Sequence, residues 1–162
     1  MDDLEIRELR ENEIPLLEEF VYHAIFLREG SAPLLRSILH DPAIAVYIQE
    51  FGRKDDHCLV ADCNGTVVGA VWTRILNGDV KGFGYVDDET PEFVISLLPA
   101  YRGKGIGTLL MKAMLKLLKQ KGYVKTSLAV QKENYAVSLY QHVGFEIIDS
   151  TDEEYIMVAH LQ

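Results

Sequence analysis

The 162-residue sequence has few cysteines and no long apolar run, and each shortage excludes a class of protein. Its two cysteines, Cys58 and Cys63, lie five residues apart within one strand pattern, so their side chains are expected to point to opposite faces. They therefore predict neither a disulfide nor a metal pair. No apolar run approaches the roughly 18 residues that span a membrane. Residues 1–5 are acidic and lack the basic-then-apolar order of a signal peptide, so we expect a cytoplasmic protein without a membrane partner or a metal.

Internal repeats, linkers and low-complexity tracts are missing too, and a chain of 162 residues is expected to form a single domain over positions 1–162. Apolar residues make up 48% and charged residues 25%, the proportions of an ordinary soluble globular protein. The 25 acidic residues exceed the 16 basic ones, for a net charge of −9. This charge argues against a nucleic-acid partner and favours a cationic or neutral one.

The basic residues are concentrated in one part of the chain. Residues 93–132 contain eight of the 16 Lys and Arg residues and none of the 25 Asp and Glu residues. Such a local excess of positive charge in an acidic molecule indicates where a polyanion would bind. We assign Lys112, Lys116 and Lys119 to the solvated face of a helix, and Arg102 and Lys104 to the anion.

The centre of this basic stretch reads as a strand, a glycine-rich turn and a helix. An apolar run over residues 93–98 ends at Pro99 and predicts a buried strand. Apolar residues at helical spacing over 106–118 then predict a helix from near Gly105 to Gly122. The first amides of that helix have no partner within it and lie at the positive end of its dipole. The turn is therefore a predicted phosphate site.

The glycine spacing excludes two common phosphate-binding motifs. A dinucleotide-binding turn needs Gly-x-Gly-x-x-Gly and an acidic residue ending the next strand, whereas this turn reads Gly103-x-Gly105-x-Gly107 and the next strand ends in Gln131-Lys132. The pattern Gly-x-x-x-x-Gly-Lys-Ser/Thr is absent as well. The turn is therefore expected to bind a phosphate ligand of a class that neither motif recognises.

The turn Arg102-x-x-Gly105-x-Gly107 resembles the acetyl-CoA signature of the GNAT superfamily of acetyl-CoA-dependent N-acetyltransferases, Gln/Arg-x-x-Gly-x-Gly/Ala. The resemblance continues through residues 128–130, Asn134 and residues 139–145, about 60 residues in the family's order. It implies a sheet in which the central strand and the strand after the helix splay apart, and in which the acetyl-pantetheine arm lies between them.

The remaining elements agree with that class of fold. Asn64-Gly65 predicts a hairpin turn, and Asn12 predicts the cap of a first helix that reaches Leu27. Residues 33–51 read as a less regular helical region interrupted at Asp41-Pro42. Strands surrounding these helices predict a mixed α/β (α+β) fold with one central mixed sheet of six or seven strands and helices on both faces. The expected strands are 4–9, 57–62, 66–76, 93–98, 124–130, 145–148 and 155–158, and the later helices are 105–121 and 134–143.

The resemblance implies that acetyl-CoA is the cosubstrate, without a metal. Its pantetheine arm would contact the backbone of Leu97 and Leu98 and the side chain of Asn134, which reads equally as a helix cap. A free amide near Leu97 or Leu98 would also stabilise the developing oxyanion. The expected cofactor-binding turn comprises Arg102, Gly103, Lys104, Gly105, Ile106, Gly107 and Thr108.

The implied reaction moves the acetyl group to a primary amine by direct attack in a ternary complex. The amine must be neutral to attack, and Glu92 is the expected base, because partial burial at the mouth of a strand would raise its pKa. The alternatives are an exposed carboxylate or a proton path through water. Tyr140 is the expected general acid, and it also contributes to cofactor binding. Its alternative is an ordinary place in the apolar helix stripe of Ala136 and Val143.

The acceptor and the assembly state are less defined. In the resembled family the region that contains Tyr22, His23, Phe26 and Tyr47 walls the acceptor site, so Tyr22, Phe26 and Tyr47 are expected substrate contacts, with ordinary packing as the alternative. The acceptor would be a small-molecule or peptide amine, and the protein a monomer or homodimer. The competing function is a non-catalytic acyl-CoA-binding or regulatory domain of the same fold.

Overall fold

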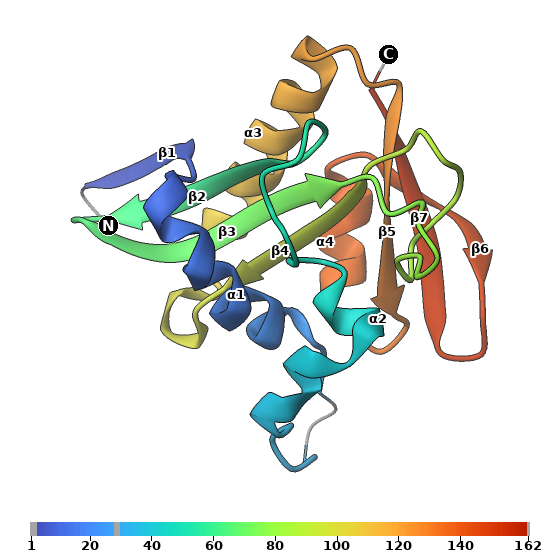
Figure 1. The fold of residues 1–162 in the computed structure, drawn as a ribbon, viewed down its shortest axis with the longest axis horizontal. Coiled ribbons are helices and arrows are strands. Elements are labelled where there is room, and N and C mark those ends of the chain that lie inside the picture. The colour runs from blue at the N-terminus through green and yellow to red at the C-terminus, as the bar shows by residue number, and fades with distance from the viewer. Residues whose placement is uncertain (1–2, 28–29, 162) are drawn as a thin grey trace.

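The computed structural model describes residues 3–27 and 30–161, and within them seven strands form one mixed sheet in the order β1-β2-β3-β4-β5-β7-β6 (Figure 1). Residues 1 and 2, the start of the acidic N-terminus, lie outside this description. The predicted mixed α/β fold is confirmed. The strands are β1 (Leu4–Glu8), β2 (His57–Cys63), β3 (Thr66–Arg74), β4 (Glu92–Leu97), β5 (Lys125–Gln131), β6 (Phe145–Ser150) and β7 (Glu154–His160). The helices are η1 (Glu11–Leu16), α1 (Leu17–Ala24), η2 (Arg36–His40), α2 (Pro42–Ala45), η3 (Pro99–Tyr101), α3 (Ile106–Gln120) and α4 (Ala136–His142).

The sheet opens between its two central strands. β4 pairs with β5 in parallel at Glu92↔Ser127, and α3 supplies the crossover that a parallel pair requires. β5 then follows β7 along its whole length, from Lys125 to Gln131, while β4 follows β3 from Glu92 to Leu97. Figure 1 shows the two strands diverging from their point of contact. The predicted splay is therefore present.

Each face of the sheet has its own hydrophobic core, because neighbouring side chains of a strand point to opposite faces. Leu59 and Ala61 pack into a core with α3, whereas Val60 packs into a second core with α1. Cys58 belongs to the second core and Cys63 packs against the first, so the prediction that the thiols face opposite sides is confirmed, and both are free. In Figure 1, α1 lies in front of the sheet and α3 behind it.

The first helix differs from its prediction at both ends. Asn12 is not a cap but lies inside η1, which follows Arg10. The Glu13 carboxylate accepts a hydrogen bond from the Arg10 amide at 2.8 Å and so holds this start in place. α1 ends at Ala24, because Ile25 is extended, and Leu27 beyond it is 42% exposed. The segment after Ala24 is thereby free to line the functional site.

The irregular region 33–51 divides into η2 and α2, as predicted, at Asp41-Pro42. The Asp41 side chain caps α2 by accepting a hydrogen bond from the Ala43 amide at 3.0 Å. No helix within residues 3–27 and 30–161 has the length and apolar character to cross a membrane. Nor do side chains in these two ranges gather as a metal site of three or more His, Cys, Asp or Glu residues.

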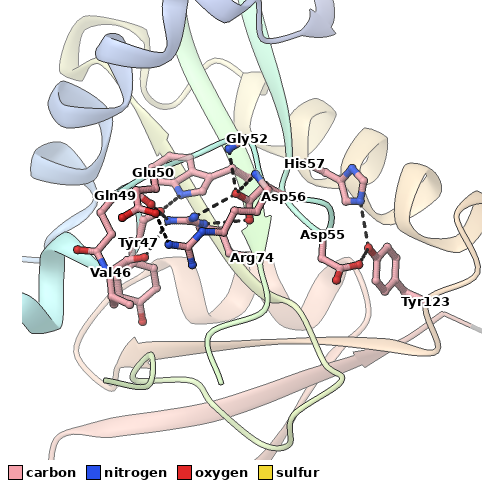
Figure 2. Close-up of polar contacts among 12 residues, drawn as sticks. Val46, Tyr47, Gln49, Glu50, Gly52, Asp55, Asp56, His57, Arg74 and Tyr123 are labelled. Carbon is pink, nitrogen blue, oxygen red and sulfur yellow. Dashed lines mark hydrogen bonds and ion pairs between the residues drawn. The ribbon is translucent and has the colours of Figure 1, made fainter. Parts of the chain in front are cut away.

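A buried ion pair ties the segment after α2 to the sheet. The guanidinium of Arg74, at the end of β3, is 2% exposed and lies 3.0 Å from each carboxylate oxygen of Asp56. The same guanidinium donates to the backbone carbonyls of Val46 at 3.0 Å and Gln49 at 2.7 Å. Figure 2 shows Arg74 at the centre of this network. Residues 46–56 are therefore anchored to β3.

Two further hydrogen-bond groups hold the same region. The indole of Trp72 donates to the Tyr47 carbonyl at 3.0 Å, which satisfies the polar atom of a fully buried ring. Beyond the ion pair, the Tyr123 hydroxyl donates to Asp55 at 2.6 Å and lies 3.1 Å from the His57 ring (Figure 2). These contacts fix the start of β2 against the connection between α3 and β5.

We expect Asp56→Asn to lower the free energy of unfolding by about 3–5 kcal/mol, because it leaves the buried Arg74 guanidinium without a counter-charge. Urea denaturation measures the loss. The matched control is Glu50→Gln, which removes the carboxylate of an ion pair with Arg53 whose side chains are 79% and 60% exposed. The control should stay within about 0.5 kcal/mol of the parent. Equal losses in the two variants would contradict the anchoring role of Arg74.

Candidate active site

A cavity of about 500 Å³ lies beside the end of β4. Its lining comes from the end of β4, the glycine turn, the end of α1 with the residues that follow it, and α4. The residues that the sequence assigned to acetyl-CoA and that line it are Leu97, Arg102, Gly103, Gly105, Gly107, Thr108, Asn134 and Tyr140. Elements distant in the sequence thus meet at the predicted site.

The glycine turn presents backbone donors to this cavity. Gly103 and Gly105 have φ values of 74° and 85°, a left-handed conformation that favours glycine, and a Cβ at either position would meet no atom within 4 Å. The Leu109 amide bonds the Gly105 carbonyl at 3.3 Å as α3 begins. The amides of residues 106–108 precede this first bond and have no acceptor within the helix. With the dipole of a 15-residue helix, they are suited to an anion, as predicted for the turn.

Arg102 and Lys104, which the sequence assigned to the same anion, point to different places in the structure. Arg102 lines the cavity, and its guanidinium donates to the carbonyls of Leu97 at 3.3 Å and His23 at 3.2 Å, which joins β4 to α1. The Lys104 ammonium lies instead 5.9 Å from the centre of the Tyr101 ring. The side chain of Ile106 is fully buried in the core, so only its backbone can face a ligand.

The backbone of β4 corrects one prediction. The Leu98 amide donates to the Val68 carbonyl at 2.9 Å, and the Leu98 carbonyl accepts from the Tyr101 amide at 2.9 Å, so neither group of Leu98 is free for a ligand. Backbone groups of a strand alternate in direction, so Leu97, opposite Gly69, turns its amide away from β3 toward the opening. Of the two expected backbone contacts, only the Leu97 amide therefore points where a ligand could accept its hydrogen bond.

A second cavity of about 320 Å³ adjoins the first and contains the acidic side chains of the site. Tyr140, Asn134 and Phe26 line both cavities, so the two spaces meet at these residues. The expected acceptor residues divide between them: Tyr47 lines the second cavity, whereas Tyr22 lines the first and donates its hydroxyl hydrogen to the Leu34 carbonyl. Tyr22 therefore faces the predicted acetyl-CoA space.

Glu92 is a buried residue of the second cavity, 4% exposed, so the alternative of an exposed strand-end carboxylate is wrong. Its Oε2 atom accepts hydrogen bonds from the Tyr47 hydroxyl and from the Gly84 amide, the latter at 3.1 Å. Its Oε1 atom has no hydrogen-bond partner among the described residues. Burial raises the pKa of Glu92 to about 7, although these two donors oppose the rise and the charge of Glu154 adds to it. The predicted upward shift is confirmed.

Sequence reasoning missed the loop that covers Glu92. A Cβ on Gly82 would lie 2.0 Å from Glu92 Oε1, so a side chain there would displace the carboxylate, and a Cβ on Gly84 would lie 2.7 Å from the Leu128 backbone, so Gly84 leaves no room for a side chain. The Phe83 amide between them donates to the Tyr47 hydroxyl at 2.8 Å. The signal in the sequence was the pair Gly82-x-Gly84, which the strand and helix patterns left unexplained.

Tyr140 lies at the junction of the two cavities. Its ring packs edge-on against Phe145, with the ring centres 6.1 Å apart, so the side chain is also part of the apolar contact with β6. Among the described residues, no group forms a hydrogen bond with the Tyr140 hydroxyl. Burial raises the pKa of this phenol to about 12, with a smaller contribution from Tyr135, so it is protonated at neutral pH.

Asn134 lies just before the N-cap residue of α4, Tyr135, and also faces both cavities. Its Oδ1 atom accepts a hydrogen bond from the Ala136 amide at 2.8 Å, so the side chain satisfies the first amide of α4 from one position before the cap. Its position in the lining of both cavities leaves the predicted contact with the pantetheine arm open.

Comparison with known proteins identifies the family. The model described as "Acetyltransferase (GNAT) family" matches residues 23–145, and the chain belongs to that family. Among solved structures, the PaiA N-acetyltransferase from Thermoplasma acidophilum in complex with coenzyme A superimposes with a TM-score of 0.69 at 20% identity. The superposition covers 98% of this chain and 99% of that one, and at this identity it shows a shared fold.

Two curated relatives extend the comparison. The ribosomal protein bS18-alanine N-acetyltransferase of Haemophilus influenzae is 38% identical over 78 residues, 46% of this chain and 53% of that protein. The chain thus spans about half the length of that relative. An acetyltransferase of Yersinia pestis is 26% identical over 151 residues, 91% of each protein.

We expect Gly107→Val to raise the Kd for acetyl-CoA by about tenfold or more, because its branched side chain enters the first cavity beside the turn. Gly107 is better suited than Gly105, where the φ of 85° would strain any side chain. The control is Gly107→Ala, whose methyl group would make only ordinary contacts, 3.7 Å from Leu97 and 4.0 Å from Leu139. Calorimetric titration gives the Kd values, and circular dichroism checks that both variants fold. Unchanged affinity in Gly107→Val would place the ligand elsewhere.

Proposed function

We propose that this protein transfers the acetyl group of acetyl-CoA to a primary amine by direct attack in a ternary complex. The observation that carries the proposal is the meeting of two cavities of opposite character at Tyr140. One has the N-terminus of α3 and Arg102 in its lining, and the other has the buried carboxylate of Glu92. The first suits a polyanionic cosubstrate, and the second suits an amine.

The residues of the first cavity fit acetyl-CoA, which would supply the acetyl group as an activated thioester. The amides of residues 106–108 and the Arg102 guanidinium are donors for its pyrophosphate. The Leu97 amide, turned toward the opening of the sheet, would pair with the extended arm or with the acyl oxygen. The Asn134 amide nitrogen adds a donor at the junction of the two cavities.

In this proposal Glu92 accepts the proton that the attacking amine must lose. A base with a pKa of about 7 is partly ionised at neutral pH and still basic enough to take a proton. The carboxylate would act directly or through one water molecule. Holding a carboxylate buried with one oxygen unsatisfied costs stability, and such strain is typical of catalytic groups. This burial favours an enzyme over a non-catalytic acyl-CoA-binding domain.

As the acetyl carbon bonds the amine nitrogen, its bond to the CoA sulfur breaks. Tyr140 would donate its phenolic proton to the thiolate that leaves. Its raised pKa keeps the proton on the oxygen until a base as strong as a thiolate appears. Its hydroxyl has no other hydrogen-bond partner within the described residues, and it lies where both cavities meet. The proton released at Glu92 and the proton given by Tyr140 balance the reaction.

Release of CoA from acetyl-CoA, measured with a panel of amines across the neutral pH range, tests the proposed function. The rate should rise as the pH passes through about 7, because Glu92 acts only when it is deprotonated. Glu92→Gln should lower kcat/KM and flatten this rise without changing acetyl-CoA affinity. CoA binding without turnover on any amine would refute the proposal.

Glu92→Gln, which should lower activity, should raise stability at higher pH. The folded protein retains the Glu92 proton up to a pH of about 7, whereas the unfolded chain loses it near its ordinary pKa of 4.5. Stability therefore falls as the pH rises through that window. Glu92→Gln cannot ionise and lacks this loss, so its melting temperature relative to the parent should increase with pH. A constant difference would contradict the raised pKa.

We expect Tyr140→Phe to lower kcat by about 10²-fold, because it removes the proton donor and retains the ring. The melting temperature should barely change, since no described group forms a hydrogen bond with the hydroxyl, and the Phe145 contact remains. The Kd for acetyl-CoA should be unaltered. Turnover within about twofold of the parent would assign Tyr140 to packing alone.

A further inference from the structure

We propose that the acceptor is a cationic amine that carries no carboxylate next to its reacting nitrogen, and that Glu154 selects it. This inference rests on the proposed function and names its substrate class. Amines, diamines and amidated or peptide N-termini belong to this class, whereas free α-amino acids do not.

The charge of the second cavity carries the inference. Two carboxylates line it, Glu92 from β4 and Glu154 from the start of β7, and none of the described lining residues is a lysine, arginine or histidine. The rest of the lining is mainly apolar, with Phe83, Phe93 and Leu128 among its larger side chains. An ammonium group would find opposite charge here, whereas a carboxylate would find two like charges and no cation.

Glu154 is half-buried and is not used elsewhere in the fold. Its side chain forms no ion pair with any residue in the described ranges. Burial raises the pKa of its carboxyl group, and the charge of Glu153 adds to the rise. Lys132 follows the β5 residue that pairs with Glu154, and its ammonium lies 5.3 Å from the centre of the Tyr155 ring. A cationic substrate would offset both the burial of the Glu154 carboxylate and its repulsion by Glu153.

Glu92 supplies an independent indication of the ligand. It is 4% exposed, yet its Oε1 atom has no hydrogen-bond partner among the described residues. A buried acceptor without a donor is rare in folded proteins. Glu92 lines the second cavity, where an amine can present N–H groups to its side chain, whereas a carboxylate substrate would bring only further acceptors.

The positive groups of the site lie in the other cavity. Arg102 and the N-terminus of α3 face the first space, where they would be taken by the phosphates of the cosubstrate. The negative groups line the space on the other side of Tyr140. The site thus separates a polyanion from a cation, and Glu154 excludes acceptors of the wrong charge by repulsion.

Matched substrate pairs test the inference directly. CoA release is measured with tyramine against tyrosine and with alaninamide against alanine, members that differ in the α-carboxylate. The parent protein should prefer the member without the carboxylate by about tenfold or more in kcat/KM. Glu154→Gln should reduce this preference about fivefold, mainly through a higher KM for the amine, and Glu154→Lys should reduce it further. The KM for acetyl-CoA should not change.

Glu146→Gln is the control, since it removes one exposed negative charge from β6 outside both cavities, and it should keep the parent preference. Equal kcat/KM within each pair, or a preference that neither Glu154 variant alters, would overturn the inference while leaving acetyl transfer intact. A complete lack of CoA release with every amine would instead overturn the proposed function, and with it this inference.

Discussion

The separation of β4 from β5 is the constraint on which the site depends. The two strands meet in parallel at Glu92↔Ser127 and then follow different partners, so the sheet opens beyond that pair. Backbone groups at such an opening need a partner other than the neighbouring strand. The opening also places the N-terminus of α3 beside β4, because α3 is the crossover between the two strands. A cavity with backbone donors on one wall is the direct result.

The buried ion pair of Arg74 connects stability to the chemistry of the second cavity. Arg74 lies opposite Glu92 in the register of β3 and β4, and it anchors residues 46–56 through Asp56 and two carbonyls. Tyr47 lies in that anchored segment and donates to Glu92, which is held from another side by Gly84. A buried arginine that makes four such contacts fixes geometry more than it adds net stability. The environment of Glu92 is therefore set partly by residues outside the acceptor space, since Arg74 and Asp56 hold the segment that carries Tyr47.

The distribution of charge inside the site differs from that of the whole molecule. The chain carries a net charge of −9, yet its basic residues are concentrated over residues 93–132 around the glycine turn. The acidic groups of the site, Glu92 and Glu154, lie in the adjoining cavity. Two ligands of opposite charge can thus approach Tyr140 from opposite sides.

The sequence by itself determined the features that arise from local order. Apolar spacing and Pro99 defined the β4–α3 unit, and the glycines at 103 and 105 defined its turn, since only neighbouring residues set these conformations. The tertiary structure decided what depends on distant contacts. Glu92 is buried by Tyr47, 45 residues away, Leu98 loses its free amide to Val68, and Glu154 reaches the same cavity from β7. Burial, and with it the pKa of Glu92, depends on long-range packing, which no local pattern specifies.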